Sequence, residues 1–290
     1  MQVKWLRRID INEKKWNACV QKSTNGYVFA MTWYLDIVCP DWEAVVLADY
    51  YAVLPLPVIR KGWFKRVYCP TLIPYTGVIN SMPMASEVLW QMIQAIPYKH
   101  IELVLNPYNK LPFKALNRHK QERFSVLDLV GDIARIEQQF KPQVEPVVDL
   151  YKNKKVAVVR DLDVTEYLTT CQQLDYKPKT IHLVHLRPLL SYALRYQSAG
   201  LYTAYNQFNQ LIGVAFVLRS NKCLSLIHYA SEDDGLMGIK AIVYHMLRNN
   251  AGANLTLEFP CCSKELGQLF TSTEHVCGVY KKGLSKWISL

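Results

Sequence analysis

The chain has 290 residues, half of them hydrophobic and a fifth charged. This balance is typical of a folded protein that is long enough to bury two cores. No apolar run approaches the roughly 18 residues that a transmembrane helix needs, and the basic residues Lys4, Arg7 and Arg8 are not followed by an apolar signal segment. Composition gives no support to a transmembrane helix, and we expect a cytoplasmic protein.

The 34 basic residues outnumber the 24 acidic ones and give a net charge of +10. An excess of this size attracts polyanions such as RNA, anionic lipid headgroups and nucleotide phosphates, but it does not choose among them. Each basic cluster is explained equally well as solvated surface. The clusters are Arg60, Lys61, Lys65 and Arg66; Arg118, Lys120 and Arg123; Lys152, Lys154 and Lys155; and Lys281, Lys282 and Lys286.

Helical and strand-like patterns follow one another in a definite order through the first half of the chain. Pro55 and Pro57 exclude a fully paired central strand, so the strand-like run that contains them is predicted to be an edge or an irregular segment, open to an extended ligand. The pattern predicts helices at 13–21 and 29–38, strands at 44–47, 52–59 and 66–68, a helix at 84–96 and a strand at 101–105.

The second half repeats that order. The matching elements are separated by about 150 residues, which is the size of one ordinary domain. The simplest interpretation is two copies of one α/β (α+β) unit. The second pattern predicts helices at 164–174 and 181–197, strands at 201–205, 211–218 and 223–230, a helix at 235–248 and a strand at 255–259.

The boundary between the copies has no flexible linker. A short helical pattern at 133–140 is closed by Pro142, Pro146 interrupts the segment after it, and 156–160 is a brief β-branched run. We therefore expect domains at 1–145 and 146–290.

The second copy has the most informative local chemistry. Its strand ends at Ser231, an acidic segment comes next, and a helix begins at Gly235. Ser231 with Asp234 fits a capping box, in which side-chain oxygens bind the unpaired N–H groups of the first helical turn. Alternatively, the strand-to-helix turn binds a phosphate at the helix N-terminus, although the carboxylates of Glu232, Asp233 and Asp234 repel that ligand.

In the first copy, basic and aromatic residues alternate. Arg60 and Lys61 follow an apolar run, and Trp63, Tyr68 and Tyr75 lie close by in the sequence. Cations grip phosphates while aromatic rings stack on bases or sugars, so this segment is a candidate substrate-binding surface. An ordinary hairpin turn with cation–aromatic packing explains the same pattern.

Residues in both halves carry a resemblance to a known family. They are Asn25, Gly26, Tyr27, Trp33, Tyr34, Leu35, Asp36, Trp42, Val53, Leu54, Pro55, Leu56, Pro57, Arg60 and Lys61, then Tyr229, Ala230, Ser231, Gly235, Phe259, Gly267 and Phe270. Together with the repeated order of elements, they resemble the tandem form of the GNAT acyltransferase fold. That form is the Fem-type (FemAB-like) aminoacyltransferases of bacterial cell-wall synthesis, here a branch from Bacteroidetes.

The resemblance implies two tandem GNAT-like domains, each a mixed central sheet flanked by helices. It implies transfer of an acyl or aminoacyl group to an amine, with acyl-CoA or aminoacyl-tRNA as the donor substrate and no tightly bound cofactor. The implied acceptor is a peptidoglycan precursor or another cell-envelope compound. Trp33 and Tyr34 of the N-terminal motif join Arg60, Lys61, Tyr68 and Tyr75 as candidate substrate-binding residues.

Acyl transfer to an amine needs hydrogen-bond donors for the oxyanion and a route for the amine proton. In the fold that this chain resembles, backbone N–H groups beside the central strand bind the oxyanion. The titratable candidates at the strand ends are His228, Tyr229 and Glu258, although a lone histidine or glutamate at a strand end is more often a structural hydrogen-bonding group. The candidate donor-binding residues are Ser231, Gly235 and Gly238.

Some features depart from the family pattern. GNAT enzymes place Arg or Gln, then Gly, then Gly or Ala around the coenzyme A pyrophosphate, whereas this chain has Glu232, Gly235 and Met237, with Gly238 one residue later. The segment 144–149, at the domain junction, lacks the basic residues of relatives. The alternative function is therefore a catalytically silent GNAT-fold binding or scaffold protein.

Other motifs give weaker signals. His182 and His185 have the spacing of a shared helix face, but no acidic residue completes a metal site. The eight cysteines show no CxxC spacing, and we interpret the vicinal pair Cys261 and Cys262 as structural. We expect no disulfide framework and no metal. No P-loop, GxSxG or GxGxxG motif is present, so hydrolase, kinase and dehydrogenase functions have no support.

Overall fold

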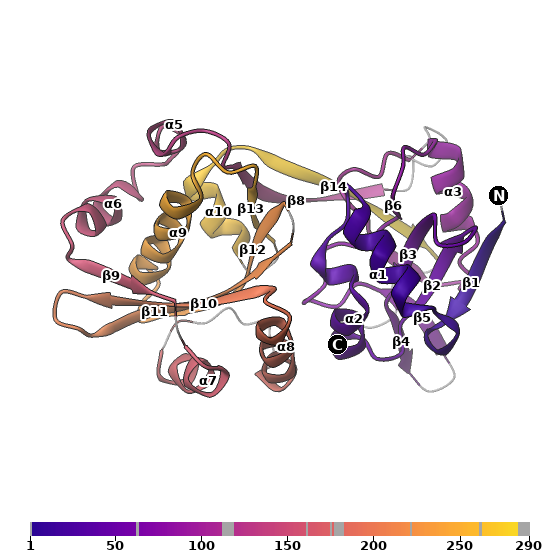
Figure 1. Cartoon of the computed structure of the whole chain (residues 1–290), viewed down its shortest axis with the longest axis horizontal. Coiled ribbons are helices and arrows are strands. Elements are labelled where there is room, and N and C mark those ends of the chain that lie inside the picture. The colour runs from indigo at the N-terminus through magenta and orange to yellow at the C-terminus, as the bar shows by residue number, and fades with distance from the viewer. Residues whose placement is uncertain are drawn as a thin grey trace. The chain divides into compact units, whose positions relative to one another are not determined.

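The computed structural model describes residues 2–61, 64–111, 119–160, 162–174, 176, 183–220, 222–260 and 263–283. The chain forms two compact units (Figure 1). The first unit comprises Met1–Arg123 and Val276–Leu290, and the second comprises Phe124–His275. Within the described ranges, no helix is long and apolar enough to cross a membrane.

The first unit contains two groups of paired strands and a core beneath α3. Asn12 begins α1 by accepting a hydrogen bond from the Lys15 N–H group, as an N-cap residue does. In chain order the elements are β1 Val3–Arg7, α1 Glu13–Lys22, α2 Thr32–Val38, β2 Glu43–Leu47, β3 Ala52–Leu56, β4 Val58–Lys61, β5 Phe64–Tyr68, β6 Ile79–Asn80, α3 Ser86–Gln94, β7 Ile101–Val104 and most of β14 Glu274–Lys282.

One group of strands has the antiparallel order β1-β2-β3-β6. In the other group, β5 pairs with β4 antiparallel and with β7 parallel, and β7 pairs with β14 antiparallel. Leu89, Met92 and Ile93 of α3 are buried against apolar residues of both groups, including Val45 and Leu103. Burial of this helix face holds the strands of the unit together.

The second unit is a mixed sheet with helices on both faces. Its strand order is β8-β13-β12-β11-β10-β9, and of the strand pairs between described residues only β12 with β13 is parallel. In Figure 1, α6 and α9 lie on one face of this sheet, and α7 and α8 lie on the other. The elements are the end of β8 His119–Asp128, then α5 Ile133–Glu137, α6 Glu145–Lys152, β9 Val156–Val159, α7 Val164–Gln173, α8 Leu183–Arg195, β10 Ala199–Asn206, β11 Leu211–Arg219, β12 Cys223–Ser231, α9 Met237–Asn250, β13 Thr256–Phe259 and α10 Lys264–Phe270.

The last strand of each half of the sequence belongs to the other unit. Residues of β8 from Ser125 to Asp128 pair with β13, and residues of β14 from Val279 to Lys282 pair with β7. The second unit consequently begins at Phe124 instead of 146, and the chain returns to the first unit at Val276. A local pattern identifies a strand but not its partner, so the sequence contained no sign of this exchange.

Two prolines can be compared with what the sequence predicted for them. Pro146 does not interrupt the structure, because it lies in the first turn of α6, where a missing N–H group costs nothing. Pro55 lies beyond Val53, where the pairing of β3 with β6 ends, as predicted for an unpaired edge. This part of β3 is fully buried, however, so the expected exposed edge for an extended ligand is absent at these described residues.

Candidate functional site

In the second unit, the parallel strands β12 and β13 separate. Their pairing includes Ser225 with Glu258, and among the described residues it ends there. β12 continues for six further residues to Ser231, whereas β13 ends at Phe259. At the start of the separation, Ser263 Oγ lies within hydrogen-bond distance of two carbonyl oxygens, that of Leu226 at 3.0 Å and that of Pro260 at 2.9 Å. A side chain therefore takes the place of strand pairing at this point.

A β-bulge at Ile227 decides which side chains share a face of the sheet. Val217 pairs with Leu226 and Phe216 pairs with His228, so Ile227 is the extra residue of β12. Leu226 and Tyr229 both belong to the core that packs against α9. Because side chains alternate along a strand, the bulge brings His228 to the same face as Ser225, which regular alternation would not do.

The imidazole of His228 is held by a tyrosine from α7. Tyr167 Oη lies 2.9 Å from His228 Nδ1, and both side chains are buried. The two rings are also in edge contact, with their centroids 6.0 Å apart. The hydrogen bond fixes the ring orientation, and the direction in which the shared proton points sets the tautomer.

Glu258 is the buried carboxylate on this face. Its side chain is 5 % exposed, and its Oε1 lies 3.5 Å from His275 Nδ1. Its Oε2 lies 3.5 Å from Ser225 Oγ. Burial, and then the charge of Glu258, raise the pKa of the Cys223 thiol well above its ordinary value, so this thiol stays protonated. Glu258 and His228 are therefore the candidate proton acceptors on this face, and the Cys223 thiol is not a candidate nucleophile.

The backbone of Tyr229 points to the side from which β13 has separated. Ser231 exchanges two hydrogen bonds with Tyr176, at 2.9 Å and 3.0 Å, so its backbone groups point away from β11. From Tyr229 to Ser231 the pairing of β12 with β11 is regular, and Tyr229 precedes Ser231 by two positions. Its N–H group consequently points the same way, whereas its aromatic ring is buried against α9.

The predicted capping box at the start of α9 is wrong. Ser231 is the last residue of β12, and its Oγ donates to the carbonyl oxygen of Ile212 at 3.3 Å. The helix begins at Met237 after Leu236, which has a left-handed backbone with φ 56°. Asp233 stabilises this turn by accepting a hydrogen bond from the Leu236 N–H group at 3.1 Å. The longer β12 places Ser231 too far from the helix to cap it.

The two predicted donor-binding glycines have different surroundings. A Cβ atom on Gly238 would lie 2.5 Å from the backbone oxygen of Ile212, because the first turn of α9 crosses β11 at close range. The lack of a side chain at Gly238 is therefore needed for packing. Gly235 is exposed in the acidic turn. Donor binding by Ser231, Gly235 and Gly238 stays a prediction.

Two of the predicted substrate-binding aromatics of the first unit lie in its core, and a third is partly buried. Tyr34 is fully buried and donates its hydroxyl to the carbonyl oxygen of Leu72 at 2.5 Å. Trp33 is partly buried and lies edge-on to Tyr34. Tyr75 is buried in edge contact with Tyr27 and Phe29. These rings pack against one another, so their burial gives no support to ligand contact.

The remaining predicted residues of this group lie on the β4–β5 hairpin. Arg60 and Tyr68 are exposed, and the Arg66 guanidinium lies 5.1 Å from the centroid of the Tyr68 ring. Lys61 is the last residue of β4, but its side chain is outside the described part of the structure. Outside it also lie Trp63, His182, the side chain of His185, Cys261 and Cys262.

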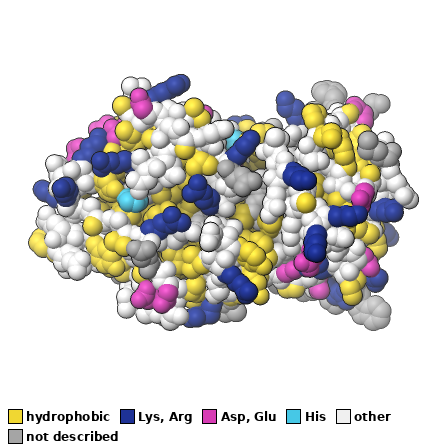
Figure 2. Space-filling view, in the orientation of Figure 1, with side chains coloured by type: hydrophobic (Ala, Val, Ile, Leu, Met, Phe, Trp, Pro, Cys, Tyr) yellow, Lys and Arg dark blue, Asp and Glu magenta, His cyan; other side chains and the backbone are white. Residues whose placement is uncertain are grey.

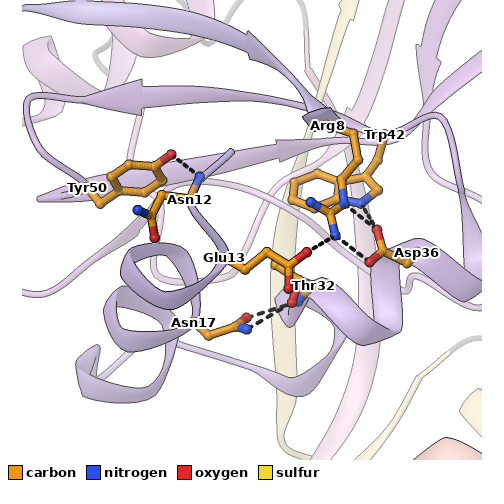
Figure 3. Close-up of polar contacts among 8 residues, drawn as sticks. All are labelled: Arg8, Asn12, Glu13, Asn17, Thr32, Asp36, Trp42 and Tyr50. Carbon is orange, nitrogen blue, oxygen red and sulfur yellow. Dashed lines mark hydrogen bonds and ion pairs between the residues drawn. The ribbon is translucent and has the colours of Figure 1, made fainter. Parts of the chain in front are cut away.

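Part of the N-terminal motif forms a closed ion-pair network (Figure 3). Asp36 accepts hydrogen bonds from Arg8 Nε at 2.5 Å, Arg8 Nη2 at 2.7 Å and Trp42 Nε1 at 2.7 Å. Glu13 binds the same guanidinium at 2.5 Å. The hydrogen bonds that Arg8 donates to Asp36 are the largest cause of a raised Arg8 pKa. Both carboxylate oxygens of Asp36 and the indole N–H of Trp42 are used within this network, which indicates a structural role for Asp36 and Trp42.

The residues that surround His228 and Glu258 were not predicted from the sequence. Tyr167 directly follows Glu166 of the Asp163–Glu166 capping box that starts α7, Ser225 lies in an apolar segment, and Ser263 precedes the charged pair Lys264 and Glu265. His275 is a single histidine in a strand that no pattern predicted. Only the apolar period of α7 gave a signal, since it marks Tyr167 as a buried position.

Comparison with known proteins gives a consistent result for the fold. No protein-family model and no curated protein matches the sequence. The crystal structure of FemX superposes with a TM-score of 0.66 and 10% identity over 97% of each chain. The chain has a FemAB-like tandem GNAT fold. The two GNAT-like units, each with a mixed set of strands and flanking helices, confirm the fold class expected from the sequence.

Two further solved structures share the tandem GNAT fold. L-PGS from Bacillus licheniformis has a TM-score of 0.55 at 8% identity, covering 96% of this chain and 93% of its own. A conserved protein of unknown function from Bacteroides thetaiotaomicron has a TM-score of 0.56 at 9% identity, covering 94% of this chain and 98% of its own. At these identities the similarity concerns the fold, and activity has to be argued from the site.

Proposed function

We propose that this chain transfers an acyl or aminoacyl group from an activated ester or thioester to an amine. The separation of β12 from β13, with the bulge at Ile227, is the observation that carries the proposal. It turns the Tyr229 N–H group toward the separation and gathers His228 and Glu258 on one face of the sheet. Acyl transfer needs an oxyanion donor and proton acceptors close together.

The proposed steps balance two protons. An ammonium acceptor loses one proton to the Glu258 carboxylate, and the resulting amine attacks the carbonyl carbon of the donor. The Tyr229 N–H group donates to the oxyanion that forms. His228 takes the second proton from the nitrogen and passes it to the leaving oxygen or sulfur as the donor bond breaks. Glu258, which is paired with His275, releases its proton to solvent.

The acidic turn before α9 bears on the class of donor. Glu232, Asp233 and Asp234 are exposed at the start of the helix, where a coenzyme A pyrophosphate would bind in a GNAT enzyme. Their carboxylates repel that group. The proposed donor is therefore an aminoacyl ester of tRNA in preference to acyl-CoA, and the net charge of +10 favours a polyanionic donor. A peptidoglycan precursor with a free amine is the proposed acceptor.

The same carboxylates favour a second candidate function, a binding protein that has kept the fold and lost the donor site. The test is a thermal-shift panel with coenzyme A, acetyl-CoA, deacylated tRNA and muropeptides. Transfer predicts that deacylated tRNA raises the melting temperature, whereas coenzyme A and acetyl-CoA, whose pyrophosphate would meet the acidic turn, do not.

A transfer assay with a mixture of aminoacyl-tRNAs and an amine-bearing muropeptide completes the test. His228→Gln should abolish product formation, whereas His245→Gln, on α9, should not. A shift with muropeptide alone, and no product with any donor, would establish the binding protein and reject the transferase.

A further inference from the structure

The β4–β5 hairpin extends beyond the strands to which it belongs. Its two strands pair from Val58–Val67 out to Lys61–Phe64. β5 pairs with β7 only through Val67 and Tyr68. Among the described residues, the outer part of the hairpin is therefore a two-stranded ribbon with no third strand beside it.

The two faces of this ribbon differ. Val58 and Val67 are buried in the core of the first unit, and Lys65, which lies on the same face by alternation, binds the buried carboxylate of Glu43 at 3.3 Å. The opposite face, here called the outer ribbon face, has no such anchor among its described side chains. It consists of Ile59, Phe64, Arg66 and Tyr68.

The outer ribbon face exposes hydrocarbon beside positive charge. The Phe64 side chain is 76% exposed, and Tyr68 is 36% exposed. The Arg66 guanidinium lies over the Tyr68 ring, 5.1 Å from its centroid. An exposed phenyl group at the end of a ribbon is unfavourable in water and favourable at the boundary between lipid headgroups and acyl chains.

We propose that the outer ribbon face docks the protein onto an anionic lipid bilayer, with Phe64 inserted and Arg66 at the headgroups. Tyrosine and arginine suit the interface because each joins an apolar body to a polar end. A nucleic acid fits this face less well, since following a phosphate backbone needs a row of cations, and the guanidinium here is stacked on Tyr68.

The second unit supplies a matched control residue. Phe208 is 72% exposed in the turn between β10 and β11, among Asn206, Gln207, Asn209 and Gln210. Its exposure is close to that of Phe64, but the flanking residues carry no charge. Lys and Arg side chains are scattered over both units on the face drawn in Figure 2, so basic residues are not confined to the unit that contains Phe64.

The experiment is sedimentation of the full chain with phosphatidylcholine vesicles, with and without phosphatidylglycerol. We expect binding only to the anionic vesicles, with Phe64→Ser weakening it about tenfold, the change that corresponds to one lost phenyl insertion. Arg66→Gln should weaken it about fivefold. Phe208→Ser should bind like the unaltered chain, and thermal unfolding should show that all three variants are folded.

Three outcomes would overturn this proposal. The first is the absence of binding to anionic vesicles, and the second is an equal loss of vesicle binding in Phe208→Ser. The third is loss of tRNA binding by Phe64→Ser and Arg66→Gln without any effect on vesicle binding, which would make the face a nucleic-acid surface. The absence of vesicle binding does not bear on acyl transfer, because the ribbon contributes no residue to the site around His228, whereas loss of tRNA binding would place the proposed tRNA donor on this face.

Discussion

Each unit has a glutamate at the end of its parallel strand pairing, but the two glutamate side chains differ in exposure and in their partners. In each unit the last described parallel strand pair includes a glutamate: Tyr68 with Glu102 in the first and Ser225 with Glu258 in the second. Glu102 is 44% exposed and bound to Lys281 at 2.6 Å. Glu258 is 5% exposed, with His275 beside it. An exposed ion pair is solvated and screened, whereas a buried carboxylate is available for proton transfer.

The strands beyond these glutamates also differ. In the second unit, β12 continues to Ser231 and reaches α9 through a short turn. In the first unit, β5 ends at Tyr68, and the segment 69–85 leads to α3. Thr76 of that segment pairs with Leu105 and donates its N–H to Val104 at 2.7 Å. In the first unit, the segment around Thr76 therefore occupies the position beside the end of β7. For this reason the proposed acyl-transfer site is the one in the second unit.

The largest expected effect is that of Glu258→Gln. If Glu258 accepts the amine proton, this isosteric change should lower the rate of transfer at least about a hundredfold. Glu102→Gln is the matched change in the first unit and should leave the rate unaltered. Steady-state kinetics with aminoacyl-tRNA would measure both. An equal loss in the two variants would remove the distinction between the units.

The packing of α9 should respond strongly to Gly238→Ala. The added methyl group meets the backbone of Ile212 and Gly213, which cannot move aside as a side chain can, so we expect a loss of roughly 2–3 kcal/mol of unfolding free energy. Gly235→Ala, in the exposed turn, should change it by less than about 0.5 kcal/mol. Urea unfolding distinguishes the two. A loss for Gly238→Ala as small as that for Gly235→Ala would show that α9 does not pack as closely on β11 as the distances at Gly238 indicate.

Tyr167→Phe tests whether Tyr167 positions His228. Removing the hydroxyl should lower kcat about tenfold, because a hydrogen bond of this kind contributes about 1 to 1.5 kcal/mol. It should also displace the pH midpoint of kcat, which loss of packing alone would not do. Tyr192→Phe, on the exposed side of α8, is the control. An unchanged pH profile would leave Tyr167 with a packing role only.

The smallest effect concerns stability and pH. Burial, and then the charge of Arg248, lower the pKa of His245 below the ordinary 6.5. The unfolded chain therefore takes up a proton at a higher pH than the folded one does, so stability is full above about 6.5 and falls as the pH drops through the folded pKa. Urea unfolding from pH 8 to 5 should show a shallower fall for His245→Gln. Parallel curves would contradict this assignment.

The sequence was sufficient for features that depend on local periodicity. Apolar spacing predicted α1, α7 and α9 to within a few residues, and the repeated order of elements predicted two copies of one unit. His228 and Glu258 were proposed as candidates from their places near the ends of predicted strands, and their catalytic roles stay a prediction. Trp33, Tyr34 and Tyr75 were not distinguishable from surface aromatics, because a residue type does not reveal which side of an irregular segment is buried.

What the sequence determined by itself is the series of helices and strands, because each depends on contacts between residues close together in the chain. The tertiary structure decided the rest. It exchanged β8 and β14 between the units, and it placed His275 against Glu258 and Tyr167 against His228. The bulge at Ile227, which turns His228 to the face of Glu258, arises from pairing with β11. These features join residues far apart in sequence, and no local pattern records them.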